Sequence, residues 1–227
     1  IIFRRTDLIK NNIIIPAYNN VVDTTLCTTL SNNHGAKVST IEHLMGALYG
    51  LGIDNLIVEV NSQEIPILDG SAKIFVEKIL STGLKSLNAP IKLIKIEKKI
   101  SYQEGNKKIF INKSKVASEI DFQINFNNKV IGVQRNKINI FNDNLNSIFE
   151  SRTFCLYEDV EKLKKAGLAQ GGSLENAVVV GDEKVLNDGG LRNSNEFVNH
   201  KILDCMGDLY LSGYRIVGSL ETSQGGH

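Results

Sequence analysis

The strongest structural signal in the sequence is one long helical pattern near its end, over residues 196–211. With a rotation of about 100° per residue, one side of this helix is apolar and carries Val198, Ile202, Cys205, Met206 and Leu209. The opposite side carries His200, Asp204 and Asp208. The other predicted helices and strands are shorter, so two consecutive α+β units are the simplest arrangement.

The first half of the chain predicts short strands and two helices. Extended segments are expected at residues 13–15, 23–30 and 56–60, and helices from about Thr40 to Leu51 and at residues 72–80. Ser39 and Glu42 have the spacing of a capping box, which would start the first of these helices. Residues 81–90 carry Gly, Ser, Asn and Pro with little periodicity. We therefore expect a first α+β domain over residues 1–88 and a second over 89–227.

The second half predicts more strands. Residues 91–100 alternate Ile or Leu with Lys or Glu, which favours a half-exposed strand. Antiparallel strands are expected at 107–111 and 119–126, helices at 142–151 and 156–166, and further strands at 177–180 and 216–221. The expected fold is α+β, with two similar domains, each a mostly antiparallel sheet layered on helices.

Composition excludes several classes of function. The chain has 227 residues and 26 Lys plus Arg against 25 Asp plus Glu, and this balance argues against a dedicated nucleic-acid-binding protein. No apolar run approaches the ~20 residues that cross a bilayer, so stable membrane insertion is not expected. Three widely spaced cysteines, at positions 27, 155 and 205, indicate a reducing compartment rather than a disulfide framework.

Two histidine elements could carry metal chemistry. His200 and Asp204 are four residues apart on a helix and can bind one ion together, although the same pattern fits the solvated face of an amphipathic helix. His43 shares one side of its helix with Gly46 and Gly50, which suggests that something approaches closely there. Glu42 could be either the capping-box glutamate or a general base beside a metal site.

Two histidines and one aspartate would make the ligand set of a hydrolytic zinc site, with one position open for water. The ligands would come from both halves of the chain, so the site would lie between the domains. Spacing alone does not establish that His43 meets His200. His227 follows two glycines and could either present its imidazole to a cleft or belong to a frayed end.

Several motifs, taken together and in order, resemble the UDP-3-O-acyl-N-acetylglucosamine deacetylase family. They comprise residues 39–44, 50–55, 64–72, 120–126, 152–154, 171–173, 185–187, 191–192, 197–204 and 207–209. The resemblance covers residues 23–227, and it implies that N-terminal residues and a C-terminal helical segment of the family lie outside this sequence. That family comprises zinc amidases that remove acetate from an acylated UDP sugar in lipid A synthesis of Gram-negative bacteria, with the active site between two α+β domains.

The resemblance implies a role for each matching residue. His43, His200 and Asp204 resemble the metal ligands, and Glu42 resembles the general base. His227 resembles the imidazole that stabilises the oxyanion and protonates the leaving amine, with Asp208 as its orienting carboxylate and Thr153 as a hydroxyl on the oxyanion. Lys201, Phe154 and Leu26 would contact substrate, and residues 156–187 would form an insert that passes the acyl chain. Gln224 stands where the family often has a basic residue that reaches a substrate phosphate.

The resemblance further implies a cytoplasmic enzyme that uses Zn²⁺, or Fe²⁺, with a UDP-acylated glucosamine as its partner; we also expect a monomer that binds no nucleic acid. Two alternatives stay open at this point. A metal-dependent two-domain α+β lyase would need more than the four histidines present. A non-catalytic α+β binding module finds its best support in the Lys-rich residues 92–115, but those lysines alternate with isoleucines as on a solvated strand.

Overall fold

The computed structural model describes residues 1–115, 117–167 and 169–227. Its first part contains two small sheets, with strand orders β2-β1-β6 and β3-β4-β5, and the helices α1 and α2. The elements are β1 (Ile2–Arg5), β2 (Ile13–Ile14), β3 (Val21–Asp23), β4 (Thr29–Ser31), β5 (Lys37–Val38), α1 (Glu42–Leu51), β6 (Ile57–Val60) and α2 (Lys73–Thr82).

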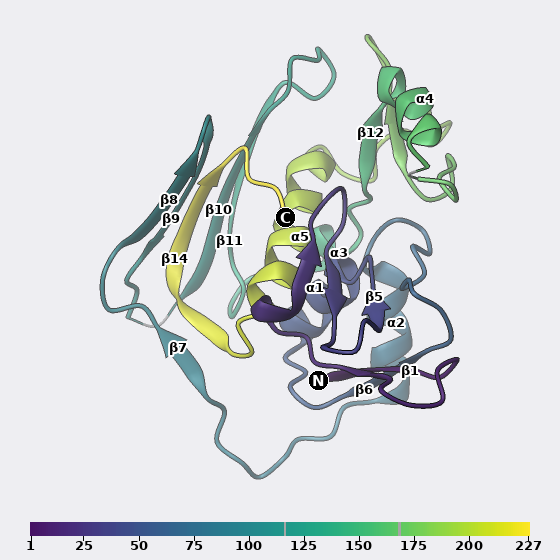
Figure 1. Ribbon diagram of the computed structural model, residues 1–227. Helices are drawn as coiled ribbons and strands as arrows, with labels where there is room; N and C mark the ends of the chain where they lie inside the picture. Colours follow the sequence, from purple (N-terminus) through teal and green to yellow (C-terminus); the bar gives the residue numbers. More distant parts are fainter. Residues whose placement is uncertain (116, 168) are drawn as a thin grey trace.

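The second part is built on a larger mixed sheet with the order β11-β10-β14-β9-β8, and β7 also pairs with β14. Its elements are β7 (Leu93–Lys95), β8 (Ile100–Glu104), β9 (Lys107–Asn112), β10 (Ser118–Asn125), β11 (Val133–Asn139), α3 (Asn146–Phe149), β12 (Phe154–Leu156), α4 (Tyr157–Lys165), β13 (Val178–Val180), α5 (Glu196–Tyr210) and β14 (Arg215–Ser223). The short pair β12-β13 runs parallel and stands beside α4, away from the large sheet (Figure 1). The fold is α+β, as the sequence predicts.

Strand β10 shows how the sequence pattern positions the large sheet. Ile120, Phe122 and Ile124 are buried, and the residues between them are more exposed. Successive strand residues point to opposite faces, so this alternation turns one face of the sheet toward the helices. β10 is antiparallel to β11 but parallel to β14, so the expected antiparallel pairing is only part of a mixed sheet.

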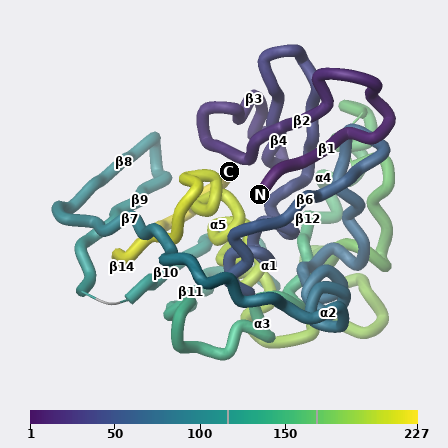
Figure 2. The backbone as a smooth tube through the Cα atoms, turned by 90° about the horizontal axis from the view of Figure 1, so that it is seen from below, coloured from purple at the N-terminus to yellow at the C-terminus, as the bar shows by residue number. Residues whose placement is uncertain are grey.

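Helices α1 and α5 lie side by side in the middle of the molecule, between the large sheet and the short strands of the first part (Figures 1 and 2). Glycines allow this approach. A Cβ atom on Gly46 would lie 2.7 Å from the Leu203 carbonyl oxygen, and one on Gly207 would lie 2.2 Å from the Glu42 carbonyl oxygen. The close approach predicted at Gly46 is therefore confirmed, and it brings the rings of His43 on α1 and His200 on α5 to 4.8 Å from each other.

Two local predictions were wrong, and one open alternative is decided. Among the described residues no side chain caps α1, because the helix begins at Glu42, three residues after Ser39, and the Ser39 N–H bonds the Gln63 carbonyl oxygen; the Glu42 carboxylate accepts a hydrogen bond from the Thr28 N–H. The alternative that His200 and Asp204 lie on a solvated face of α5 fails, since they are 2% and 4% exposed. Residues 91–100 do not form one strand; they contribute only β7 and the first residue of β8.

Other boundaries shifted. The expected helix over residues 142–151 is confined to Asn146–Phe149, and the expected extended segment 23–30 contains a bend between β3 and β4.

All strand pairings in the described ranges join strands on the same side of residue 88, and this supports the two-domain division, which stays a proposal. Within those ranges, no helix is both long enough and apolar enough to span a bilayer.

Candidate metal centre and active site

Three buried side chains from the two central helices converge on one point. His43 comes from the first turn of α1, and His200 and Asp204 are one turn apart on α5. The Nε2 atoms of His43 and His200 lie 3.6 and 3.5 Å from Asp204 Oδ1, and one ligand atom from each residue lies within 4.8 Å of the others. The two halves of the chain therefore supply a single two-nitrogen, one-oxygen group that can hold a metal ion.

The surroundings of Asp204 Oδ1 indicate a site for a cation. This atom is buried and has no hydrogen-bond partner among the described residues, whereas Oδ2 accepts a hydrogen bond from Lys201 Nζ at 2.9 Å. Although burial opposes its charge, the positive groups around it hold the pKa of Asp204 far below its usual range. An ionised, unsatisfied oxygen between two imidazole nitrogens is costly without a metal ion, so these residues fit one.

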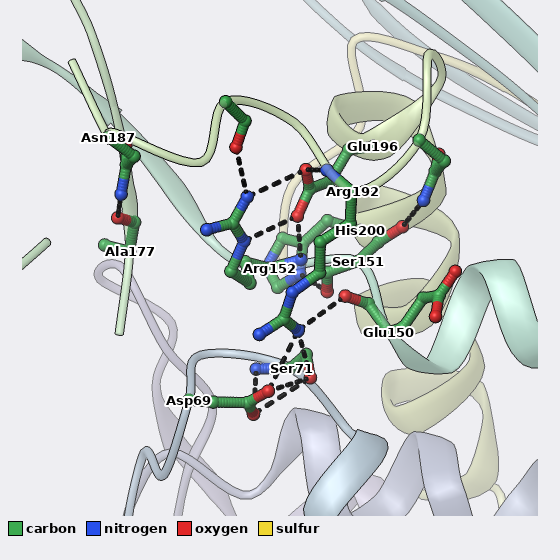
Figure 3. A network of polar contacts seen from close by, with 12 residues as sticks. Asp69, Ser71, Glu150, Ser151, Arg152, Ala177, Asn187, Arg192, Glu196 and His200 are labelled. Atoms are coloured by element: carbon green, nitrogen blue, oxygen red, sulfur yellow. Dashed lines mark hydrogen bonds and ion pairs between the residues drawn. The ribbon is translucent and has the colours of Figure 1, made fainter. Parts of the chain in front are cut away.

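The imidazoles are neutral, as metal ligands must be. Burial lowers the pKa of His43, and it lowers the pKa of His200 to about 3. His200 Nδ1 lies 3.1 Å from the Ser151 carbonyl oxygen, so Nδ1–H donates there and Nε2 keeps a lone pair that could bind a metal ion. Figure 3 shows His200 beside Ser151 in this arrangement.

A buried ion pair supports the Ser151 carbonyl. Glu196, which is 0% exposed, accepts hydrogen bonds from the backbone N–H and the Nε of Arg152 at 3.1 and 2.8 Å. It also accepts one from the Arg192 backbone N–H at 2.7 Å (Figure 3). Because Arg152 follows Ser151 directly, the Arg152–Glu196 ion pair fixes the peptide group whose carbonyl oxygen accepts the hydrogen bond from His200 Nδ1–H.

Arg192 connects the two halves of the chain at the same place. Its Nη1 donates to Asp69 Oδ2 and to the Glu150 carbonyl oxygen, each at 2.9 Å, and lies 3.3 Å from the Ser71 hydroxyl (Figure 3). This guanidinium, together with the Ser71 hydroxyl, holds the pKa of Asp69 below its usual range even though burial opposes the charge. The candidate ligand His200 is thus anchored to the loop that precedes α2.

Glu42 lies next to the candidate ligand His43 and is 3% exposed. Its Oε2 accepts a hydrogen bond from the Thr28 N–H at 3.1 Å. Burial, reinforced by the negative charge of Asp204, raises the pKa of Glu42 to about 7. A carboxylate with this pKa, beside a metal site, is suited to take a proton from water near neutral pH.

His227 is brought to the same centre by the chain that follows β14. Its Nδ1 donates to Asp208 Oδ2 at 2.9 Å, and its Nε2 lies 3.9 Å from Asp204 Oδ2. Burial opposes the charge of the imidazolium, but the hydrogen bond to Asp208 and the charge of Asp204 outweigh it and raise the pKa of His227 to about 9. This residue is therefore a fixed cation at neutral pH and not a frayed end.

A cleft of about 340 Å³ opens beside these groups. Lys201, Asp204, Asp208 and His227 line one part of it, and the β8-β9 hairpin lines another with Tyr102, Lys107 and Lys108. Negative neighbours, Asp204 foremost, raise the pKa of Lys201 despite its burial, so this lysine stays charged. The cleft therefore brings several cations to the side of the candidate metal centre where Asp204 lies.

The remaining predicted site residues are less tightly bound to the centre. The Thr153 backbone bonds Gly70 and Val178, two residues beyond Ser151. The Phe154 ring stacks edge-on against Phe197 and lies 6.3 Å from the His200 ring. Leu26 is 56% exposed, in a left-handed conformation two residues before Thr28. Val160 and Leu163 of α4, in the predicted insert, are only partly buried. The Gln224 backbone N–H donates to the Gln123 carbonyl oxygen, and its side-chain amide donates to the Asn125 carbonyl oxygen.

Sequence reasoning missed Thr28, Lys107 and Lys108. Thr28 lies in a Thr-rich stretch with no pattern that sets it apart, and its hydroxyl reaches a residue 180 positions away. Lys107 and Lys108 are part of the Lys-rich stretch and looked like a solvated strand face. Only the pairing of β9 with β14 places them near His227.

Comparison with known proteins decides the family. A family model described as LpxC, UDP-3-O-acyl N-acetylglycosamine deacetylase, matches residues 1–227. The chain belongs to this deacetylase family. The LpxC family is one of metal-dependent deacetylases, and the buried group of His43, His200 and Asp204 gives this member a place for the ion.

Curated relatives in the LpxC family agree with the match. The chain is 42% identical to the UDP-3-O-acyl-N-acetylglucosamine deacetylase of Photobacterium profundum and 43% identical to that of Pasteurella multocida. It is 46% identical to the deacetylase of Shewanella violacea. Each alignment covers 100% of this chain and 75% of the relative.

Proposed function

We propose that this protein removes the N-acetyl group from a UDP-3-O-(3-hydroxyacyl)-N-acetylglucosamine, releasing acetate in lipid A biosynthesis. The observation that carries the proposal is the convergence of His43, His200 and the unsatisfied Asp204 Oδ1 in a chain of the deacetylase family. Neither a lyase nor a non-catalytic module is favoured by any of these residues.

The ligand set suits Zn²⁺, although imidazole and carboxylate also bind Fe²⁺. Zinc with three protein ligands keeps one position for water or substrate, acidifies that water and polarises a carbonyl oxygen. His43 Nε2, His200 Nε2 and Asp204 Oδ1 would hold the ion. The Ser151 carbonyl would keep His200 in the required tautomer.

The protein's own groups supply both proton transfers of amide hydrolysis. Glu42 takes a proton from water as the water oxygen attacks the acetyl carbon. His227, held charged by Asp208, stabilises the developing negative oxygen and gives its Nε2 proton to the sugar nitrogen when the C–N bond breaks. The products are acetate and the free amine. Thr153 is proposed as a second donor to the oxyanion.

The cleft fits the charge of a UDP sugar. Lys107, Lys108 and Lys201 line it together with His227, and a diphosphate would find cations there. These lysines supply positive charge near Gln224, where the family often has a basic residue. Phe154 and Leu26 are proposed to contact the apolar part of the substrate, and the insert 156–187 to receive the acyl chain.

The direct test is acetate release from the UDP-acylglucosamine substrate by the purified chain, with and without a chelator. We expect release that stops on chelation and returns with added Zn²⁺, and about one zinc per chain by metal analysis. His200→Ala should lose both metal and turnover. His34→Ala is the matched control, because His34 is exposed and its backbone N–H bonds Asn32. Full zinc occupancy in His200→Ala would refute the ligand assignment.

A further inference from the structure

Thr28 contacts two site carboxylates from two different helices. Its backbone N–H donates to Glu42 Oε2 of α1 at 3.1 Å, and its hydroxyl donates to Asp208 Oδ1 of α5 at 2.7 Å. The residue lies just before β4 and is 2% exposed. One residue thus joins the carboxylate beside the metal ligands to the carboxylate that holds His227.

The two oxygens of Asp208 are divided between these contacts. Oδ2 accepts from His227 Nδ1 at 2.9 Å, and Oδ1 accepts from the Thr28 hydroxyl. A carboxylate held at only one oxygen can rotate about its terminal torsion, which is a broad, two-fold potential. The second contact fixes the plane of Asp208 and with it the direction of the His227 ring.

We propose that Thr28 is a positioning residue for the hydrolysis: its hydroxyl orients Asp208, and through Asp208 the imidazole of His227. The inference rests on the proposed function and adds a residue to it. Glu42 is held by the Thr28 backbone, so a change of the Thr28 side chain isolates the contact with Asp208. Removing the outer hydrogen-bond partner of a metal ligand typically costs about 10–100-fold in activity, and we expect the same range for the partner that orients His227 through Asp208.

Thr28→Val removes the hydroxyl and keeps the branched shape. The Asp208 side chain is 26% exposed, so water can satisfy Oδ1 in the variant, and what is lost is orientation rather than a buried charge. We expect unfolding at the wild-type temperature, unchanged metal content and unchanged KM, with kcat lowered about 10–100-fold.

Two variants control this experiment. Thr28→Ser keeps the hydroxyl and should recover most of kcat. Thr29→Val removes the adjacent hydroxyl, which bonds Ser39 and not a site carboxylate, and should keep wild-type kcat. Thr28→Val with wild-type kcat, or Thr28→Ser as slow as Thr28→Val, would overturn the proposal.

A double-mutant cycle tests the route through Asp208. In an Asp208→Ala background, Thr28→Val should cost nothing further, whereas an equal loss in both backgrounds contradicts the proposal. A readout independent of turnover is the NMR signal of the His227 Nδ1–H proton, which should exchange faster in Thr28→Val and stay protected in Thr28→Ser and Thr29→Val. If the wild type released no acetate, the proposed function would fail, and an unchanged imidazole signal in Thr28→Val would separately overturn the positioning role.

Discussion

The close contact between α1 and α5 predicts that Gly207→Ala will push the two helices apart. In an open helix this change should stabilise the protein by about 1 kcal/mol, because alanine has the higher helix propensity. Here the new Cβ would lie 2.2 Å from the Glu42 carbonyl oxygen and 3.0 Å from the Glu42 Cα. These are backbone atoms of a helix and cannot turn aside, so α1 must move away by about 1 Å to reach ordinary van der Waals separation.

That movement of α1 would lower the stability of the protein and distort the candidate site. Overpacking of this kind costs about 1–3 kcal/mol, so after the propensity gain of about 1 kcal/mol the net loss of about 0–2 kcal/mol would lower the unfolding temperature of a chain of this size by up to about 8 °C. The displacement carries Glu42 and His43 away from His200 and Asp204. Metal–ligand distances tolerate only about 0.2 Å, and a 1 Å misplacement can cost about 100-fold in rate.

The assays are thermal unfolding, metal analysis and acetate release, each on metal-loaded protein. Gly189→Ala is the matched control, because a Cβ there has nothing within 4 Å, and the residue is exposed. We expect the control to stay within about 0.5 kcal/mol of the wild type. Gly207→Ala that unfolds at or above the wild-type temperature with full metal content would show that the two helices are not fixed by this glycine.

Three further predictions follow from the site. Glu42→Gln should keep its metal content and lose about 10²–10⁴-fold in kcat, and near-normal turnover would remove Glu42 as the base. Chelation should lower the unfolding temperature, since an ion that binds only the folded chain stabilises it by about 2.7 kcal/mol at 100 times its Kd; no shift in calorimetry would count against a buried site. Asp69→Asn should destabilise the protein at pH 7. The Asp69 pKa is lowered from 3.8 by Arg192, so its contribution exists above that pH, and urea melts of variant and wild type should converge as pH falls through the lowered value; a constant gap would contradict this.

The long helix shows what the sequence could predict. The periodicity of residues 196–211 gave α5 almost to the residue, and its spacing put His200 and Asp204 on one side. The alternative that this side is solvated fails because α5 is covered twice, by the large sheet on one side and by α1 on the other. Periodicity within one helix carries no information about a second partner.

The rest of the site depends on contacts between distant segments. The sequence left Glu42 as either a cap or a base. It is the first residue of α1 rather than part of a cap, and its carboxylate accepts the Thr28 N–H, a contact that no local pattern predicts. His43 can meet His200 because Gly46 and Gly207 let α1 and α5 approach closely. The identity of these residues as one site came from resemblance to a family, because no local pattern encodes a distance between residues 157 positions apart.

The charges around His43, His200 and Asp204 show why these residues and a bound cation belong together. Glu42, Asp204 and Asp208 bring three carboxyl groups together, where Lys201 bonds Asp204 and the protonated His227 bonds Asp208. A buried, charged oxygen without compensation is expensive, and among the described residues the fully buried carboxylate oxygen left without a partner is Asp204 Oδ1, between two neutral imidazoles. This unsatisfied atom lies at the point where three candidate ligand atoms meet. A divalent cation would satisfy it, so the same residues that make the folded chain costly on its own suit it to hold a metal ion.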